Sequence, residues 1–317
     1  MTFHHSTEFQ NALEAAAAYH KLQPAFIEKD YWVTYVLKNI ALSDYHNQIV
    51  FKGGTSLSKA YQCIERFSED VDLALLKTGK ETNSQLKRLI ENIEAIATQG
   101  LNYQKDPKES KGGHLRKTFW QYPKFNNDET ATTGENILVE INCFTTPVPH
   151  KSMAICSYVG NFLTNNGFLD LVNNHDLHPF NLQILSLERT FYEKLLSLTR
   201  LSYEGIDKLK EKIRHFYDLY QLFYLPDLGE ILFESQNLKL IVHIQQDDKS
   251  NPIFRGKWED KKLYDAPIIA QFEEIWKILA PIYESEMPIL LWGELPHPSN
   301  IELLFRKIRA FLLENKL

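Results

Sequence analysis

Cysteine is scarce in this sequence. The 317 residues contain three cysteines, Cys63, Cys143 and Cys156, and none belongs to a Cys-x-x-Cys pair. An odd number of cysteines without that spacing excludes both a disulfide framework and a structural zinc site of the usual type. We therefore expect neither redox chemistry nor zinc binding.

Long apolar runs are also absent. No window approaches the roughly 18 apolar residues that a membrane-spanning helix needs. The first residues, Met1-Thr2-Phe3-His4-His5, lack the basic flank and apolar stretch of a signal peptide. The sequence thus favours a cytoplasmic protein with no membrane partner.

An excess of positive charge is missing as well. Lys and Arg number 35 against 41 Asp and Glu, which gives a formal net charge of −6. A nucleic-acid partner would therefore have to meet a local basic patch. Residues 105–124 are the candidate patch, either an RNA-facing surface or a solvated hairpin with its aromatic residues in the core. Their charged side chains are Lys105, Asp106, Lys108, Glu109, Lys111, Arg116, Lys117 and Lys124.

The hydrophobic pattern predicts two structural units. In the first, helices are expected at residues 11–18, 26–41, 56–65 and 86–97, and strands at 49–51, 71–76, 116–122 and 137–144. From residue 185 onward the period is helical, with helices expected at 188–201, 208–223, 268–279 and 301–313 and an exposed loop at 247–260. A mixed α+β unit is therefore followed by an α-helical one.

The sequence has neither Gly-x-x-x-x-Gly-Lys nor Gly-x-Gly-x-x-Gly after a strand, which argues against P-loop and dinucleotide folds. It has instead Phe51-Lys52-Gly53-Gly54-Thr55-Ser56 between a predicted strand and a predicted helix. Glycines let a phosphate approach the backbone, whose N–H groups donate to it. Gly53, Gly54, Thr55 and Ser56 are therefore candidate ligands of a triphosphate.

Asp70-Val71-Asp72 follows Ser56 by fourteen residues. In a strand, residues i and i+2 point to the same face, so Asp70 and Asp72 would set two carboxylates side by side. Such a pair suits Mg²⁺ and phosphoryl chemistry. Either motif alone is commonly a plain turn or a solvated strand edge, but their combination predicts a nucleotide-handling site.

Glu140 is the candidate for a third carboxylate. It is a lone acid within Ile137-Leu138-Val139-Glu140-Ile141, where an unpaired charge is costly unless a cation or a hydrogen-bond partner meets it. We expect it to join Asp70 and Asp72 as a metal ligand and to help remove a proton from the attacking hydroxyl. The alternative is an edge-strand glutamate that faces water.

Five stretches resemble motifs of the AbiEii/AbiGii toxin family of nucleotidyltransferases, within the polymerase-β-like superfamily, and the resemblance runs from about residue 26 to about residue 222. They are Glu28-Lys29-Asp30-Tyr31-Trp32-Val33, Phe51-Lys52-Gly53-Gly54-Thr55-Ser56-Leu57-Ser58-Lys59, Arg66-Phe67-Ser68-Glu69-Asp70-Val71-Asp72-Leu73, Thr190-Phe191-Tyr192-Glu193-Lys194-Leu195-Leu196-Ser197-Leu198 and Arg214-His215-Phe216-Tyr217-Asp218-Leu219-Tyr220. The resemblance implies a polymerase-β-like fold with a helical C-terminal unit. It also implies a toxin of a toxin–antitoxin or abortive-infection (antiviral defence) system, with a possible cognate antitoxin.

The resemblance further implies that Lys194 contacts the nucleotide phosphates and that Asp218 belongs to the same site. Arg66 either stabilises the leaving pyrophosphate or pairs with Glu69. Whether Thr55 or Ser56 supplies the hydroxyl of the phosphate-binding turn stays open.

We therefore expect a nucleotidyltransferase domain at residues 1–183 and an α-helical domain at 184–317. The expected reaction is Mg²⁺-dependent transfer of a nucleoside monophosphate from an NTP to a hydroxyl of RNA, with the 3′ end of tRNA as the acceptor. The alternatives are a protein-modifying nucleotidyltransferase and a non-catalytic nucleotide-binding module of the same fold.

Overall fold

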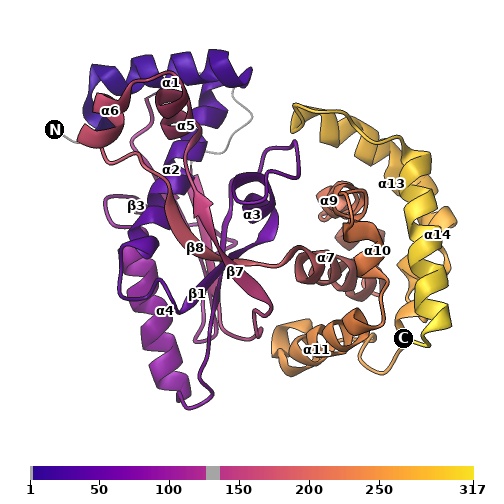
Figure 1. Ribbon diagram of the computed structural model, residues 1–317. Helices are drawn as coiled ribbons and strands as arrows, with labels where there is room; N and C mark the ends of the chain where they lie inside the picture. Colours follow the sequence, from indigo (N-terminus) through magenta and orange to yellow (C-terminus); the bar gives the residue numbers. More distant parts are fainter. Residues whose placement is uncertain (1–2, 126–135) are drawn as a thin grey trace. The chain divides into compact units, whose positions relative to one another are not determined.

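The computed structural model describes residues 3–125 and 136–317, and the chain divides into two compact units (Figure 1). The first unit comprises Met1–Tyr61 and Phe67–Leu185, and the second comprises Gln62–Arg66 and Ser186–Leu317. The predicted domain boundary lies at residues 183/184, with Gln62–Arg66 in the first domain.

The described part of the first unit contains an eight-stranded mixed sheet with the order β3-β5-β6-β2-β1-β8-β7, and β4 pairs with β5 at its side. Strand β2 is antiparallel to β1 and parallel to β6, and β1 is parallel to β8. The strands are β1 (Ile49–Lys52), β2 (Val71–Leu75), β3 (Asn102–Gln104), β4 (Ser110–Lys111), β5 (Leu115–Gln121), β6 (Asn136–Asn142), β7 (His150–Ile155) and β8 (Phe180–Leu185).

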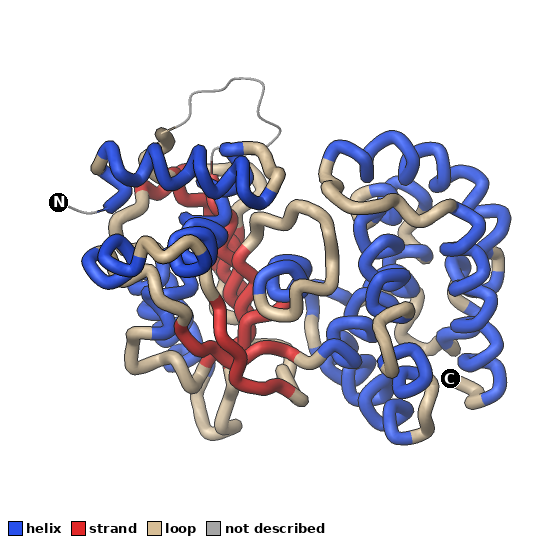
Figure 2. The backbone as a smooth tube through the Cα atoms, turned by 45° about the horizontal axis from the view of Figure 1, so that its top comes forward, coloured by secondary structure: helices blue, strands red, loops and turns tan. Residues whose placement is uncertain are grey.

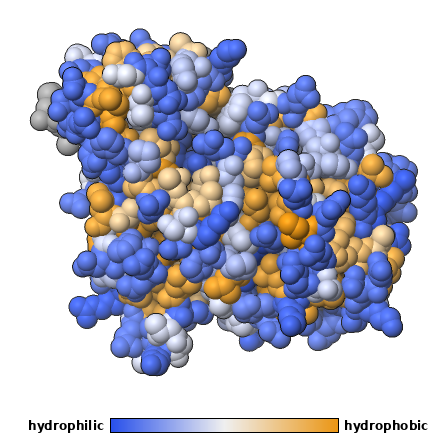
Figure 3. Space-filling view, in the orientation of Figure 1, coloured by the Kyte–Doolittle hydropathy of each residue, from blue (hydrophilic) through white to orange (hydrophobic). Residues whose placement is uncertain are grey.

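Local capping explains where several helices of this unit begin. Ser6 accepts the Phe9 N–H at the start of α1, and Thr82 and Gln85 form a reciprocal capping box at the start of α4. The helices are α1 (Thr7–His20), α2 (Pro24–Ala41), α3 (Gly53–Lys59), α4 (Asn83–Ala97), α5 (Tyr158–Asn165) and α6 (Leu169–Asn174). The apolar side of α4 is buried, while its outer side is mainly hydrophilic (Figure 3).

Helices α2 and α4 pack together, and both contact β6. Thr118 of β5 donates to Glu94 of α4 over 2.6 Å, and Thr118 is in register with Val139 of β6, which is in register with Val71 of β2. These residues therefore share the face that α4 covers, because register partners point to one side of a sheet. Their chain neighbours point to the opposite face.

In the described part of the second unit the regular secondary structure is helical (Figure 2), and an isolated bridge joins Arg66 to Leu291. Its helices are α7 (Leu187–Ser202), α8 (Ile206–Lys210), α9 (Ile213–Phe223), α10 (Leu228–Leu232), α11 (Gln236–Ser250), α12 (Pro267–Ala270), α13 (Phe272–Glu286) and α14 (Pro298–Glu314). Part of its core is formed by stacked rings of Phe272, Trp276 and Phe305, against which the ring of Phe216 lies tilted. Within the described residues, no helix is long and apolar enough to cross a membrane.

The predicted α+β fold with a helical C-terminal unit is confirmed, but four predicted segments were wrong. Helix α3 ends at Lys59 rather than at residue 65, because Gln62 has a φ of +52° and Glu65 O accepts the Trp292 N–H over 3.1 Å. The predicted helix 208–223 is two helices, α8 and α9, and the predicted helix 268–279 is likewise two, α12 and α13. The predicted loop 247–260 begins inside α11, whose Asp247 and Asp248 are buried.

Candidate functional site

A row of four charged residues crosses the centre of the sheet. Lys52 of β1 is in register with Asp72 of β2, Asp72 with Glu140 of β6, and Glu140 with Lys117 of β5. All four therefore share the face opposite α4, and directly opposed residues have their Cβ atoms about 5 Å apart. Two neighbouring carboxylates thus lie between two amines, which we call the charged row.

Asp70 comes immediately before the first residue of β2, outside the regular strand. Asp70 was predicted to combine with Asp72 and Glu140. The structure pairs the latter two in register, yet no three His, Cys, Asp or Glu side chains within residues 3–125 and 136–317 are grouped as a metal site. Two adjacent carboxylates still have the hard oxygen donors that Mg²⁺ prefers, so Asp72 and Glu140 fit such an ion.

Gly53 lies directly against Asp72. Its φ is +77°, and a Cβ atom at this position would lie 2.0 Å from Asp72 Oδ2. Only glycine combines this backbone conformation with so close an approach. The glycine turn, which directly follows β1, therefore lies against the carboxylate of Asp72 in the charged row.

The two hydroxyls of the turn have different partners. Thr55 Oγ1 lies 2.9 Å from Ser68 Oγ, in the segment that leads to Asp70, whereas Ser56 Oγ donates to Gly53 O over 2.9 Å. Both residues are buried. Thr55 thus connects the turn to the Asp70 segment, and Ser56 stabilises the turn itself; which of them meets a phosphate stays a prediction.

The second unit contains its own cluster of predicted site residues. Arg66 donates to both oxygens of Asp218, with Nε 2.6 Å from Oδ1 and Nη2 2.7 Å from Oδ2, and Lys194 Nζ lies 2.8 Å from Oδ2. Asp218 has an exposed fraction of 0%. Burial alone would raise the pKa of Asp218, but Arg66 and Lys194 hold that pKa well below its usual range.

Two further titratable groups surround this cluster. Burial, followed by the charge of Asp218, raises the pKa of the Cys63 thiol to about 12. Burial, followed by the charge of Lys194, lowers the pKa of His215 well below its usual value, and no partner in the described part of the chain bonds its buried Nδ1. The thiol and the imidazole therefore remain neutral at pH 7.

The structure thus gathers the predicted residues into two sets. Asp70, Asp72, Glu140 and the turn Gly53–Ser56 belong to the first unit. Arg66, Lys194 and Asp218 belong to the second. Sequence reasoning missed Lys52, whose position beside Gly53 at the end of a strand was the available signal.

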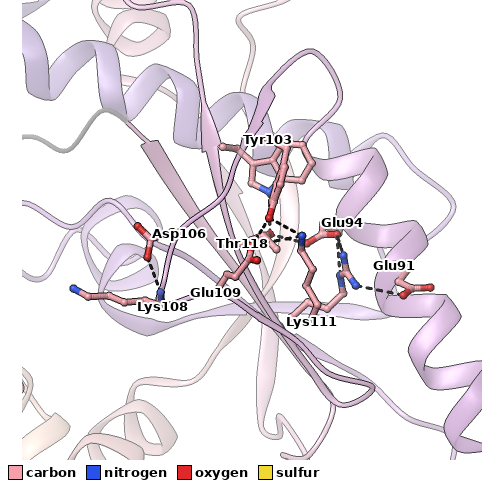
Figure 4. Close-up of polar contacts among 10 residues, drawn as sticks. Glu91, Glu94, Tyr103, Asp106, Lys108, Glu109, Lys111 and Thr118 are labelled. Carbon is pink, nitrogen blue, oxygen red and sulfur yellow. Dashed lines mark hydrogen bonds and ion pairs between the residues drawn. The ribbon is translucent and has the colours of Figure 1, made fainter.

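The candidate basic patch at residues 105–124 is partly neutralised by acidic side chains of its own segment and of α4. Lys111 Nζ lies 2.6 Å from Tyr103 Oη and 3.5 Å from a Glu109 oxygen, and the Tyr103 hydroxyl also donates to Glu109 (Figure 4). Arg116 lies beneath α4, with Nε 2.8 Å from Glu94, and only 11% of its side chain is exposed.

Arg116 and Lys117 therefore point to opposite faces of the sheet, since successive strand residues alternate. Arg116 and Lys117 thus do not share one surface, and whether the patch meets RNA or is a solvated hairpin stays a prediction. Arg116 stabilises the packing of α4, while Lys117 ends the charged row.

The mixed sheet, the charged row and the glycine turn define a nucleotidyltransferase-type fold followed by helices. The solved structure of the nucleotidyltransferase toxin MenT4 from Mycobacterium tuberculosis H37Rv is similar to the chain, with a TM-score of 0.54 and 17% identity over 92% of this chain and 83% of that one. A protein from H. pylori, provisionally assigned as a nucleotidyltransferase, matches with 16% identity over 74% of this chain and 100% of that one, at a TM-score of 0.32. No curated protein matches the sequence.

The model of the family "Nucleotidyl transferase AbiEii toxin, Type IV TA system" matches residues 35–262. The chain belongs to this family and is a nucleotidyltransferase toxin of a type IV toxin–antitoxin system. The match extends beyond residue 222, where the motif resemblance was expected to end, and includes α10 and α11.

Proposed function

We propose that this toxin transfers a nucleoside monophosphate from an NTP to the terminal ribose hydroxyl of tRNA and releases pyrophosphate. The observation that carries the proposal is the register pair Asp72 and Glu140 with the Gly53 turn seated against Asp72. Adjacent carboxylates beside a turn of backbone N–H groups suit a nucleotide that carries its own cation.

Asp72 and Glu140, together with Asp70, would hold Mg²⁺. When bound, Mg²⁺ supplies electrostatic stabilisation of the charge that develops on the phosphate oxygens. Gly53, Gly54, Thr55 and Ser56 receive the triphosphate, and Glu140 also accepts the proton of the attacking hydroxyl. The hydroxyl oxygen bonds to the α-phosphorus, and the bond from that phosphorus to the bridging oxygen of pyrophosphate breaks.

Lys194 supplies positive charge to the leaving pyrophosphate in this proposal, as a lysine suits a diffuse phosphate charge. Asp218 keeps Lys194 and Arg66 in place through the ion pairs of the second unit. Arg66, whose guanidinium is held in one orientation by Asp218, stabilises the negative charge of the leaving pyrophosphate as well. These roles rest on the family resemblance, and the ion pairs show that the three residues form one cluster within the second unit.

The choice of a tRNA end rests on the charge of the chain. A net charge of −6 disfavours an extended RNA contact, and Lys111 and Arg116 already have acidic partners. An acceptor end offers few phosphates and an exposed hydroxyl nucleophile. Lys117, beside Glu140, is the basic side chain of the patch that belongs to the charged row.

The test is incubation of the protein with each α-labelled NTP, Mg²⁺ and either total RNA or total protein. We expect label in the tRNA band and none with the Asp72→Asn variant, which keeps the shape of Asp72. Label in a protein band alone would identify a protein acceptor. No label with any NTP, despite binding of NTP, would indicate a binding module.

A further inference from the structure

The segment Glu28-Lys29-Asp30 of α2 has no role in the chemistry proposed above, yet it is unusually buried. Every residue from Ala25 to Thr34 is buried, although neighbouring residues of a helix point in directions about 100° apart. Glu28, Lys29 and Asp30 have exposed fractions of 1%, 0% and 8%. Three consecutive charged residues therefore enter the interior of the first unit in three different directions.

Asp30 holds the helix that follows the glycine turn. Its Oδ1 forms an ion pair with Lys59, the last residue of α3, and its Oδ2 accepts the Tyr158 N–H over 2.8 Å. Helix α3 begins at Gly53. One carboxylate thus connects the far end of the turn-bearing helix to α2 and to the start of α5.

Lys29 holds the two segments that carry carboxylates. Its Nζ lies 3.1 Å from Glu69, the residue before Asp70, and donates over 2.6 Å to the carbonyl of Asn136, the first residue of β6. Burial lowers the pKa of Lys29, while Glu69 and then Asp70 oppose this shift. Asp70 therefore lies within electrostatic reach of Lys29.

Glu28 holds the chain that leaves β5. Its Oε1 accepts the Phe125 N–H over 2.5 Å, and β5 ends at Gln121. Lys29 also lies over the ring of Tyr122, with Nζ 5.4 Å from the ring centroid. The strand that carries Lys117 is thus fixed to α2 at its end.

We infer that Glu28, Lys29 and Asp30 are positioning residues, each of which fixes one segment of the nucleotidyltransfer site: Asp30 the turn and α3, Lys29 the Asp70 segment and β6, and Glu28 the end of β5. The inference rests on the proposed function, which makes these segments parts of the nucleotidyltransfer site. It predicts a different effect for the substitution of each of these three neighbouring residues. If all three served only to stabilise the core, the three substitutions would have the same effect.

The experiment compares Glu28→Gln, Lys29→Met and Asp30→Asn with the parent by hydrogen–deuterium exchange, by binding of the four α,β-methylene nucleoside triphosphates with Mg²⁺, and by kcat for transfer of label from the α-labelled NTPs. Asp30→Asn should speed exchange in residues 53–61 and raise the nucleotide Kd about tenfold, because the turn loses its anchor. Lys29→Met should speed exchange in residues 67–72 and 136–140 and lower kcat about 100-fold with Kd within about threefold of the parent. Glu28→Gln should speed exchange at residues 119–125.

Two further variants complete the design. Lys29→Arg keeps the charge and should recover most of kcat. Glu94→Gln removes the charge that pairs with Arg116 on the opposite face of the sheet from the charged row, and it should leave Kd and kcat unchanged.

Uniformly faster exchange over the first unit in all three variants, or a parental kcat in Lys29→Met, would overturn the inference. If the parent transfers nucleotide to no acceptor, the exchange and Kd patterns still decide the positioning roles. In that case only the proposed function fails.

Discussion

The α-carbon of Gly53 lies against the carboxylate of Asp72, so closely that a Cβ atom there would lie 2.0 Å from Oδ2. The glycine turn and the charged row are therefore a single arrangement, because the carboxylate of Asp72 occupies the space that a side chain at position 53 would need. This relationship joins two motifs that stand nineteen positions apart in the sequence.

Gly53→Ala should abolish nucleotide transfer and lower the free energy of unfolding by roughly 2–4 kcal/mol, because a left-handed φ and a steric clash add together. Gly79→Ala is the matched control. Gly79 also has a left-handed φ, +80°, but nothing lies within 4 Å of its Cβ position. The control should lose only about 1 kcal/mol in urea unfolding and keep its activity. Equal losses in the two variants would refute a tight fit between Gly53 and Asp72.

Much of the first unit could be predicted because its signals are local. Alternating or continuous apolar runs indicated β1, β2, β5 and β6, and the lone acid in β6 indicated Glu140. Strand β8 was missed although it lies beside β1, because Phe180–Leu185 directly precedes a strongly helical segment. Its parallel pairing with β1 depends on contacts more than a hundred residues apart in sequence, which no local period reveals.

The ion pairs of the second unit also escaped prediction. Asp247 and Asp248 looked like loop residues, yet they pair with Arg189 and Arg200 of α7. Arg66 likewise has a partner, Asp218, that lies 152 positions away. Charged residues are usually solvated, so composition alone predicts exposure, and only the tertiary fold identifies the buried partner.

Asp218→Asn should destabilise the second unit by about 3–5 kcal/mol at pH 7, because it leaves Arg66 and Lys194 buried near a neutral amide. The pKa of Asp218 is lower in the folded chain than its ordinary value of 3.8. Its contribution is therefore fully present above about pH 4 and is lost as the pH falls through the folded pKa.

The measurement is the free energy of unfolding of parent and variant between pH 7 and pH 2. We expect the difference between them to be largest at neutral pH and to shrink below about pH 4. A difference that does not change with pH would contradict the ionised state of Asp218. Lys210→Ala is the control, because its partner Asp207 is exposed and the pair should contribute little.

Arg116→Met should affect stability and Lys117→Met should affect RNA binding, because these neighbouring side chains lie on different faces of the sheet. Arg116→Met leaves Glu94 buried without its cation and should lower the free energy of unfolding by about 2 kcal/mol while KM for RNA stays near the parental value. Lys117→Met should leave the midpoint of unfolding nearly unchanged. It should raise KM for RNA and reduce its dependence on salt. A rise in KM for RNA in Arg116→Met alone would reverse the assignment.

The terminal ribose of tRNA should be the acceptor, and periodate treatment tests this directly. Periodate converts the terminal cis-diol to a dialdehyde and so removes the attacking hydroxyl, while every internal 2′-hydroxyl and every phosphate remains. We expect treated tRNA to receive no label from any NTP, and untreated tRNA to receive it in proportion to its intact ends. If contact involves about three phosphates of a single-stranded end, the logarithm of affinity should fall with that of salt with a slope of about −2. Label on treated tRNA would place the acceptor at an internal hydroxyl, and a much steeper slope would indicate an extended RNA surface that the net charge of −6 disfavours.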